Sequence, residues 1–224
     1  MCGRFAVGTI DQQVWSDWLE AEMPATPPEP RWNIAPTTQV LIVGPNRRTA
    51  MARWGLIPPW WTKPLAMMKA TTFNARSEEV AEKPMFRDAW AARGRSGRCL
   101  VPAIGYYEWS GKKGAKVPWF VSVRDNRPGC CMAGLWADAF VDGAWLRSCT
   151  ILTAAAGAAT AHLHPRTPVI LEEQEWSDWL SGTRTAELMR APDDSRLACW
   201  EVGPEVGNVR NEGRTLIARA GLGI

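Results

Sequence analysis

The segment from Cys99 to Thr153 restricts the possible folds of this chain more than any other feature. Four stretches rich in β-branched and aromatic residues follow one another there: CLVPAIGYYEW, VPWFVSV, CCMAGLWADAF and WLRSCTILT. The segments between them, SGKKGAK, RDNRPG and VDGA, contain the residues that favour turns. Strands joined by short turns pair with their neighbours in antiparallel fashion. We therefore predict an antiparallel meander at the centre of the fold.

Helical patterns lie on both sides of this meander. Thr9 and Gln12 have the spacing of a capping box, and apolar residues then recur at helical spacing at Ile10, Val14, Trp15, Trp18 and Leu19. This helix should end before Pro24. A second amphipathic helix is predicted from Glu172 to Leu180, with Gly182 placed to end it.

Two further elements are predicted before the meander. The stretches TQVLIV and RTAMARW indicate a hairpin that turns around Gly44-Pro45-Asn46. Ser77 is a candidate cap for a short helix through Val80, which Pro84 interrupts.

Length and composition favour one large domain. With 224 residues, 46% of them hydrophobic, the chain can bury a sizeable core. We predict a single domain over residues 1–224, of the α+β class, built on a curved antiparallel sheet flanked by helices. Neither a signal-peptide pattern nor an apolar run of about 18 residues occurs, so we expect a cytoplasmic protein, nucleoid-associated if bacterial, without membrane contact.

The cysteines and histidines give little support to a metal site. The six cysteines show no C-x-x-C spacing, and His162 and His164 are the only histidines. We expect no metal and no organic cofactor.

Charge is distributed unevenly along the chain. Between Arg31 and Lys116 there are fifteen Lys and Arg residues against five Asp and Glu residues, which leaves eleven basic and eighteen acidic residues elsewhere. The same stretch is rich in tryptophan, and interleaved basic and aromatic residues suit single-stranded nucleic acid, whose bases stack on aromatic rings. Because the chain has 14 tryptophans in all, most of them must belong to the core.

Cys2 has the most distinctive chemistry. Removal of Met1 would place an α-amine and a thiol on one residue, and both are partly nucleophilic near neutral pH. Such an aminothiol reacts with an aldehyde to give first an imine and then a five-membered thiazolidine. The alternative is a buried, inert cysteine that happens to lie near the start of the chain.

Arginines accompany several of the chemically interesting residues. In an extended strand, residues i and i+2 share a face, and this spacing joins Cys2 to Arg4, Asn74 to Arg76, and His164 to Arg166. A guanidinium beside each group would suit a site that acts on the sugar of a phosphodiester chain. In GYYEW, the same alternation places Ile104, Tyr106 and Glu108 on one largely apolar face, where burial would raise the pKa of the Glu108 carboxyl. A solvated strand glutamate is the alternative.

An ordered set of motifs resembles a known family. The segments MCGRF, RWNIAPT, RWGLIPPWW, FNARSE, KPMFRDAW, RCLVPAIGYYEW, AGLWA and HPRTPVIL are similar to those of the SRAP family, the SOS response-associated peptidase-like, abasic site processing proteins. These proteins crosslink to abasic sites in single-stranded DNA. The resemblance implies a barrel-like β-core and a positively charged channel for single-stranded DNA.

The resemblance also assigns site residues. The family's nucleophile corresponds to Cys2, and its asparagine, glutamate and histidine correspond to Asn74, Glu108 and His164. The His-x-Arg-x-Pro pattern fits a start at His164 and not at His162, although the family usually has Met where this chain has Thr167, and Pro165 is also unexpected. The implied DNA-binding residues are Arg4, Asn33, Trp60, Trp61, Arg76, Arg87, Trp109 and Arg166.

The function implied is that of a monomeric DNA-repair protein that crosslinks itself to abasic sites through Cys2. Removal of Met1 by an autopeptidase activity and a minor lyase activity would accompany this chemistry. Two alternatives stay open: an N-terminal-nucleophile amidohydrolase or peptidase that uses Cys2, and a noncatalytic reader of single-stranded DNA that uses Trp60 and Trp61.

Overall fold

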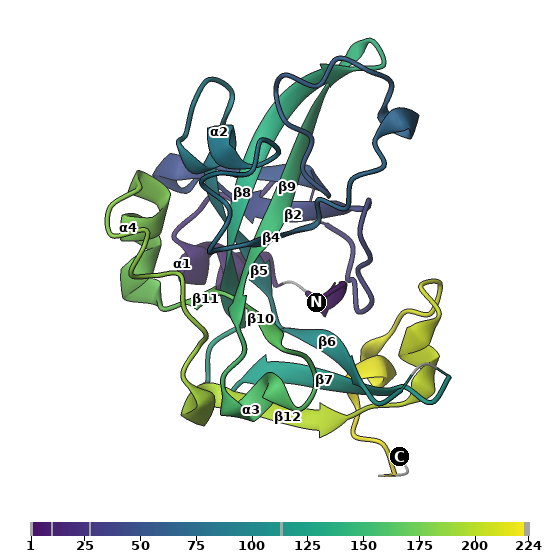
Figure 1. Cartoon of the computed structure of the whole chain (residues 1–224). Coiled ribbons are helices and arrows are strands. Elements are labelled where there is room, and N and C mark those ends of the chain that lie inside the picture. The colour runs from purple at the N-terminus through teal and green to yellow at the C-terminus, as the bar shows by residue number, and fades with distance from the viewer. Residues whose placement is uncertain (1, 10, 27, 113, 222–224) are drawn as a thin grey trace.

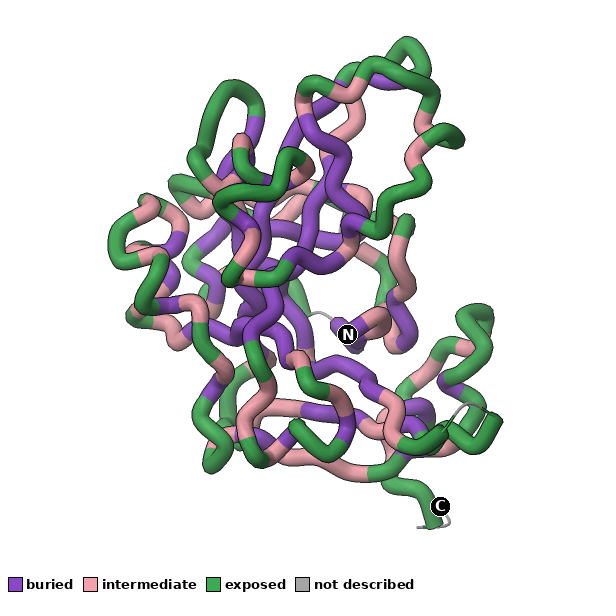
Figure 2. The backbone as a smooth tube through the Cα atoms, viewed as in Figure 1, coloured by how far each residue is buried: buried purple, intermediate pink, exposed green. Residues whose placement is uncertain are grey.

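Five strands form a closed barrel in the computed structural model, which describes residues 2–9, 11–26, 28–112 and 114–221. They are β2 (Gln39–Val43), β3 (Thr49–Trp54), β5 (Ser96–Ala103), β8 (Cys130–Val141) and β9 (Ala144–Ala155). Successive pairs are β2 with β3, β3 with β9, β9 with β8, β8 with β5, and β5 with β2, which closes the ring. All these pairs are antiparallel except β3 with β9. Buried residues follow the barrel strands closely (Figure 2).

A second, smaller sheet is next to the barrel and is drawn below it in Figure 1. Its strands are β1 (Arg4–Ala6), β6 (Gly105–Ser110), β7 (Val117–Val123) and β12 (Leu197–Glu201), antiparallel in that order. A separate apolar cluster that includes Tyr107, Phe120, Val206 and Leu216 packs under this sheet.

The predicted meander is correct in its two hairpins, β6 with β7 and β8 with β9, and wrong in joining these strands into one sheet. The stretch CLVPAIGYYEW divides at Ile104, and β5 pairs with β8, whereas β6 pairs with β7 in the second sheet. Gly105 permits this change of sheet, because a Cβ at its position would lie 2.5 Å from the Phe120 ring and from the Val121 carbonyl oxygen. The hairpin of β6 and β7 is therefore inserted in the chain between β5 and β8, which are neighbours in the barrel.

Three short strands pair with β8 or β9 in addition to the five strands of the closed barrel. The strands β4 (Asn74–Arg76) and β10 (Arg166–Pro168) both pair with β9, and β11 (Ile170–Leu171) pairs with β8. The β4–β9 pair is parallel, so the sheet is mixed and not purely antiparallel as predicted. The curved barrel of an α+β fold is confirmed.

The predicted helices at the two ends of the chain are confirmed, with one correction to a cap. Helix α1 (Gln12–Leu19) begins at Asp11, whose side chain accepts a hydrogen bond of 3.1 Å from the Val14 amide. The predicted capping box at Thr9 is wrong, since the nearer carboxylate satisfies the free amide. Ile10 lies outside the described residues. Helix α4 (Trp176–Ser181) follows a 3₁₀ turn, η3 (Glu173–Glu175), and ends at Gly182 as predicted.

In the middle of the chain, one predicted helix does not form, and a short helix that was not predicted follows it. The hairpin of β2 and β3 is confirmed, with η1 (Pro45–Arg47) at its turn. The helix predicted from Ser77 to Val80 is wrong, because that segment forms turns, and α2 (Arg87–Trp90) begins only after Pro84. The remaining helical elements are α3 (Ala158–Ala161), η2 (Leu65–Met67), η4 (Asp194–Arg196), η5 (Pro204–Gly207) and η6 (Arg214–Ile217). Among the described residues, no helix has the length and apolar character needed to cross a lipid bilayer.

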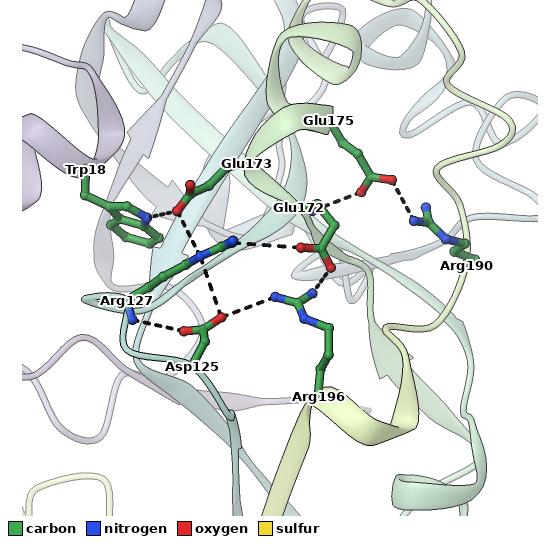
Figure 3. Close-up of polar contacts among 8 residues, drawn as sticks. All are labelled: Trp18, Asp125, Arg127, Glu172, Glu173, Glu175, Arg190 and Arg196. Carbon is green, nitrogen blue, oxygen red and sulfur yellow. Dashed lines mark hydrogen bonds and ion pairs between the residues drawn. The ribbon is translucent and has the colours of Figure 1, made fainter.

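A network of charged side chains joins the second sheet to the barrel (Figure 3). Arg127, in the connection from β7 to β8, lies 3.2 Å from the Glu173 carboxylate. Arg196, just before β12, binds Glu172 and lies 3.3 Å from Asp125. These contacts connect one end of the second sheet, where β7 ends and β12 begins, to the segment that leads into α4.

Candidate active site

Cys2 lies between the two sheets and is completely buried. Its carbonyl oxygen accepts a hydrogen bond of 2.7 Å from the Asn74 side-chain amide, and its thiol donates to the Arg4 carbonyl at 3.4 Å. Asn74 begins β4, at the barrel, whereas Arg4 begins β1, in the second sheet. Both sheets therefore fix the position of Cys2. Met1, whose removal is predicted, lies outside the described residues.

Glu108 lies in β6, the strand that pairs with β1. Its side chain is buried, as the alternation in GYYEW predicts, with 5% of the residue exposed. Burial raises the pKa of the Glu108 carboxyl above its ordinary value. Burial also raises the pKa of the Cys2 thiol, and the negative charge of Glu108 adds to this effect. The carboxyl is thus close enough to Cys2 to influence its titration.

His164 lies in the connection from α3 to β10. The Arg166 amide donates a hydrogen bond of 3.0 Å to Nδ1 of His164, so in the neutral ring the proton is carried by Nε2. Burial lowers the pKa of His164, and the positive charges of Lys116 and Arg166 lower it further. His164 is therefore a neutral imidazole at neutral pH.

An open pocket of about 470 Å³ connects Glu108 and His164 to the surface. It is lined by Glu108, Trp109, Lys116, His164 and Gly207. His162 does not line it, and its ring packs edge-on against Trp119 with 5.4 Å between ring centroids. The pocket supports the choice of His164 over His162.

Lys116 was not predicted as a site residue. It precedes β7, at the end of the SGKKGAK turn, and Ser110 and Val117 are paired in the hairpin register. That register brings Lys116 to the mouth of the pocket that Glu108 lines.

Two unusual residues of the His164 motif fit the local backbone. Thr167 is buried, and its hydroxyl lies 2.9 Å from the Tyr106 hydroxyl, so each satisfies the other. The Pro165 carbonyl accepts a hydrogen bond of 3.0 Å from the Ala156 amide. Neither residue displaces His164 from the pocket.

Arg4 is oriented by Asn33 and by the chain near the C-terminus. Its guanidinium donates to the side-chain oxygen Oδ1 of Asn33 at 2.7 Å and to the backbone carbonyl of Val206 at 3.1 Å, and it lies 6.0 Å from the centre of the Trp109 ring. Asn33 is completely buried and also donates to the carbonyls of Val206, Asn208 and Asn211. A direct contact from Asn33 to DNA would require these hydrogen bonds to open.

Arg166 is already engaged by a carboxylate. Both oxygens of Glu78 accept hydrogen bonds from its guanidinium, at 2.7 and 2.8 Å, and the Thr153 carbonyl accepts a third. Glu78 was not predicted as a site residue, although it belongs to the FNARSE motif. Arg76, in contrast, is exposed and lies 3.4 Å from Glu79.

Three further predicted DNA-binding residues lie away from the pocket of Glu108. Trp60 is exposed, with its ring centroid 6.3 Å from that of Trp61, which packs against a small apolar cluster of the barrel. The Trp60 indole N–H lies 3.4 Å from the Pro84 carbonyl, and Arg87 is exposed at the start of α2. The structure thus brings together Cys2, Asn74, Glu108 and His164, whereas Trp60, Trp61 and Arg87 do not line the pocket.

The arrangement offers several groups that can transfer or accept protons. The side-chain oxygen of Asn74 is buried and has no hydrogen-bond partner among the described residues, so it can accept a hydrogen bond from a reacting group. Glu108 and His164 face one pocket, one with a raised pKa and one with a lowered pKa. Such a pair suits general acid and base catalysis near neutral pH.

Known proteins resemble this chain over nearly its whole length. The abasic site processing protein YoqW of Bacillus subtilis is 29% identical over 228 residues, 97% of this chain and 99% of that protein. The abasic site processing protein YedK of Escherichia coli is 30% identical over 230 residues, with the same coverage. A crystal structure from Bacteroides thetaiotaomicron has a TM-score of 0.84 at 21% identity, covers 98% of this chain and 100% of its own, and supports the fold alone. Residues 1–209 match the family model for SOS response associated peptidase (SRAP), and the chain therefore belongs to the SRAP family.

Proposed function

We propose that this protein processes abasic sites in single-stranded DNA, and that it does so by forming a covalent crosslink through Cys2 after Met1 is removed. The observation that carries the proposal is the position of Cys2, which is held by Asn74 and lies close to Glu108. The relatives YoqW and YedK are named abasic site processing proteins, which supports the same substrate.

The chemistry follows from the two nucleophiles of one residue. The ring-opened sugar of an abasic site exposes an aldehyde at C1′, and the α-amine of Cys2 adds to it to form a carbinolamine. Loss of water gives an imine, and addition of the thiol across the C=N bond closes a thiazolidine. The product has the mass of protein plus DNA minus one water. Because the thiol is tethered to the amine, the second step has a high effective concentration.

The neighbouring side chains have separate roles in this proposal. The free oxygen of Asn74 accepts a hydrogen bond from the attacking amine or from the carbinolamine hydroxyl. Glu108 transfers protons during dehydration and takes the proton of the buried thiol, whose raised pKa keeps it uncharged until it reacts. His164, with its proton on Nε2, assists opening of the sugar ring.

The thiol also decides the fate of the strand. An imine at C1′ acidifies the C2′ hydrogens and favours β-elimination, which would cut the DNA. Thiazolidine closure removes the imine and so protects the strand. A minor lyase activity and removal of Met1 by the protein itself are consistent with the same groups. We propose a monomer as the active form.

The test uses an oligonucleotide that carries one abasic site. Processed wild-type protein should form an adduct that survives denaturing electrophoresis, and its intact mass should equal protein without Met1 plus DNA minus water. Cys2→Ser should lose most of this adduct. Cys199→Ser, which changes a half-buried thiol in β12, serves as the control and should retain it. The absence of an adduct with processed wild-type protein would reject the proposal.

A further inference from the structure

The hairpin of β8 and β9 projects beyond the rest of the barrel and forms an arm, residues 138–147 (Figure 1). Pairing of β5 with β8 stops at Ala137, and pairing of β3 with β9 begins only at Ser148. The inner face of the arm packs Ala139, Val141 and Leu146 into a small apolar cluster with Ile57, Trp61, Leu65 and Met68. The arm is therefore stabilised from one side, and its outer face is not needed for that packing.

The outer face of the arm carries two exposed aromatic side chains. Phe140 and Trp145 are opposite each other in the β8–β9 register, with 5.6 Å between ring centroids. Phe140 is 53% exposed and Trp145 is 60% exposed, although both are large apolar residues. The pair presents ring surface to the solvent at a place where the fold does not require it.

Two arginines lie against the tryptophans on this face. The Arg95 guanidinium is 4.4 Å from the centre of the Trp145 ring, and the Arg147 guanidinium is 4.6 Å from the centre of the Trp136 ring. Both arginines bind the Asp138 carboxylate, at 3.0 Å and 2.7 Å. Burial alone would raise the pKa of Asp138, but the hydrogen bonds from the arginines outweigh it and lower the pKa. Two positive charges thus share one negative charge, so the cluster of Arg95, Asp138 and Arg147 carries an excess of positive charge. The other carboxylate of the arm, Asp142 in its turn, accepts a hydrogen bond from the Leu65 amide.

The positive aromatic surface continues onto the barrel. A pocket of about 310 Å³ lies next to the arm, between the turn of β2 and β3 and the base of the β8–β9 hairpin. Arg48, Trp136 and Arg147 line it, together with apolar residues. Arginine and aromatic side chains therefore alternate from the tip of the arm to this pocket.

We infer that the outer face of the arm, Arg95, Phe140, Trp145 and Arg147 with the adjoining Arg48, binds single-stranded DNA outside the lesion site. Unpaired bases can stack on exposed aromatic rings, and phosphates can approach the arginines. Charge complementarity favours a polyanion, and the exposed rings favour unpaired bases over a duplex, whose bases are already stacked. The identity of the partner rests on the proposed function, but the surface itself does not.

The test measures binding of a fluorescein-labelled, 30-nucleotide single strand without any lesion, by fluorescence anisotropy. Trp145→Ser should weaken binding about fivefold or more, because the loss of one stacked base costs at least that factor. Trp145→Phe keeps a stacking face and should restore most of the affinity. Val14→Ser, which removes an exposed apolar side chain from α1, is the matched control and should change nothing. Arg48→Gln should weaken binding and reduce its dependence on salt.

Separate measurements distinguish failure of this inference from failure of the proposed function. Crosslinking to a five-nucleotide strand with a central abasic site reports on the Cys2 site alone, and Trp145→Ser should leave it unchanged. If the wild type does not crosslink but Trp145→Ser still loses affinity for the intact strand, the proposed function fails and the inference stands. Unchanged affinity in Trp145→Ser, or an equal loss with duplex DNA, overturns the inference. Unchanged DNA affinity with loss of self-association in sedimentation would assign the arm to a second copy of the chain and overturn it too.

Discussion

Glu78 occupies the guanidinium of Arg166, the residue predicted to contact a DNA phosphate. A phosphate that binds Arg166 at the same donors must first displace this carboxylate. We therefore predict that Glu78→Gln, which keeps the shape of the side chain but removes its charge, strengthens binding of single-stranded DNA. The amide oxygen of glutamine can still orient the arginine, but it competes less strongly with a phosphate.

The expected gain follows from the exposure of the pair. Two hydrogen bonds of 2.7 and 2.8 Å join the groups, but the Glu78 side chain is 53% exposed and the Arg166 side chain 15% exposed. Exposed ion pairs contribute about 0.2–1 kcal/mol after screening by solvent. Relief of the competition should therefore tighten DNA binding by at most about fivefold.

The pair also gives this effect a pH dependence. The hydrogen bond from Arg166 lowers the pKa of Glu78, so its contribution to stability is present above the pKa of the unfolded chain and is lost as pH falls through the lower pKa of the folded protein. Below that pKa, Glu78 is protonated and resembles glutamine. The difference in DNA affinity between Glu78→Gln and the wild type should therefore be largest near neutral pH and vanish in acid.

Fluorescence anisotropy with an intact single strand, at several pH values, measures this difference. Glu187→Gln is the matched control, because it removes the same charge from an exposed glutamate that binds Arg184, which is not a predicted DNA-binding residue. The reasoning is refuted if the two variants bind DNA equally well, since the effect would then be one of net charge. It is also refuted if Glu78→Gln binds more weakly, since Glu78 would then serve to position Arg166 for DNA.

Three other substitutions test the site. Asn74→Ala leaves the buried Cys2 carbonyl without its hydrogen bond and should lower the free energy of unfolding by about 1–3 kcal/mol in urea denaturation, with slower crosslinking. Burial raises the pKa of Glu108 in the folded protein, so the wild type loses stability as pH rises from the unfolded pKa through the folded one. Glu108→Gln should therefore become more stable relative to the wild type over that rise in pH, and a constant difference in the free energy of unfolding would contradict this. His164→Ala should slow crosslinking while His162→Ala, on the Trp119 ring, leaves it unchanged, as single-turnover rates would show.

Local sequence patterns predicted the elements whose causes are local. The β2–β3 hairpin, the helices near both ends and the burial of Glu108 each follow from periodicity or turn chemistry within a few residues. Closure of the barrel could not be predicted in this way. It depends on the pair of Arg53 and Trp54 with Ser148 and Cys149, and on the single pair of Val43 with Leu100, which join distant parts of the chain.

The same division applies to the site. Residue chemistry and strand spacing singled out Cys2, Asn74, Glu108 and His164, the family resemblance gave them catalytic roles, and the structure brings them together. Glu78 and Lys116 were missed because their importance comes from contacts across the fold, with a residue 88 positions away in one case and with a pocket in the other. For Asn33, the motif predicted a DNA contact, but it could not show that the side-chain amide donates hydrogen bonds to backbone carbonyls inside the protein.

The change of sheet at Gly105 links the fold to the chemistry. If β6 continued the barrel beside β5, as a meander requires, Glu108 would belong to the same sheet as Asn74. Instead, Asn74 extends the barrel and Glu108 lies in the second sheet, with Cys2 between them. The relative position of the nucleophile and its proton acceptor therefore depends on how the two sheets are held together. The network of Asp125, Arg127, Glu172, Glu173 and Arg196 lies at that connection (Figure 3), so we expect these residues to help fix the position of Glu108 relative to Cys2.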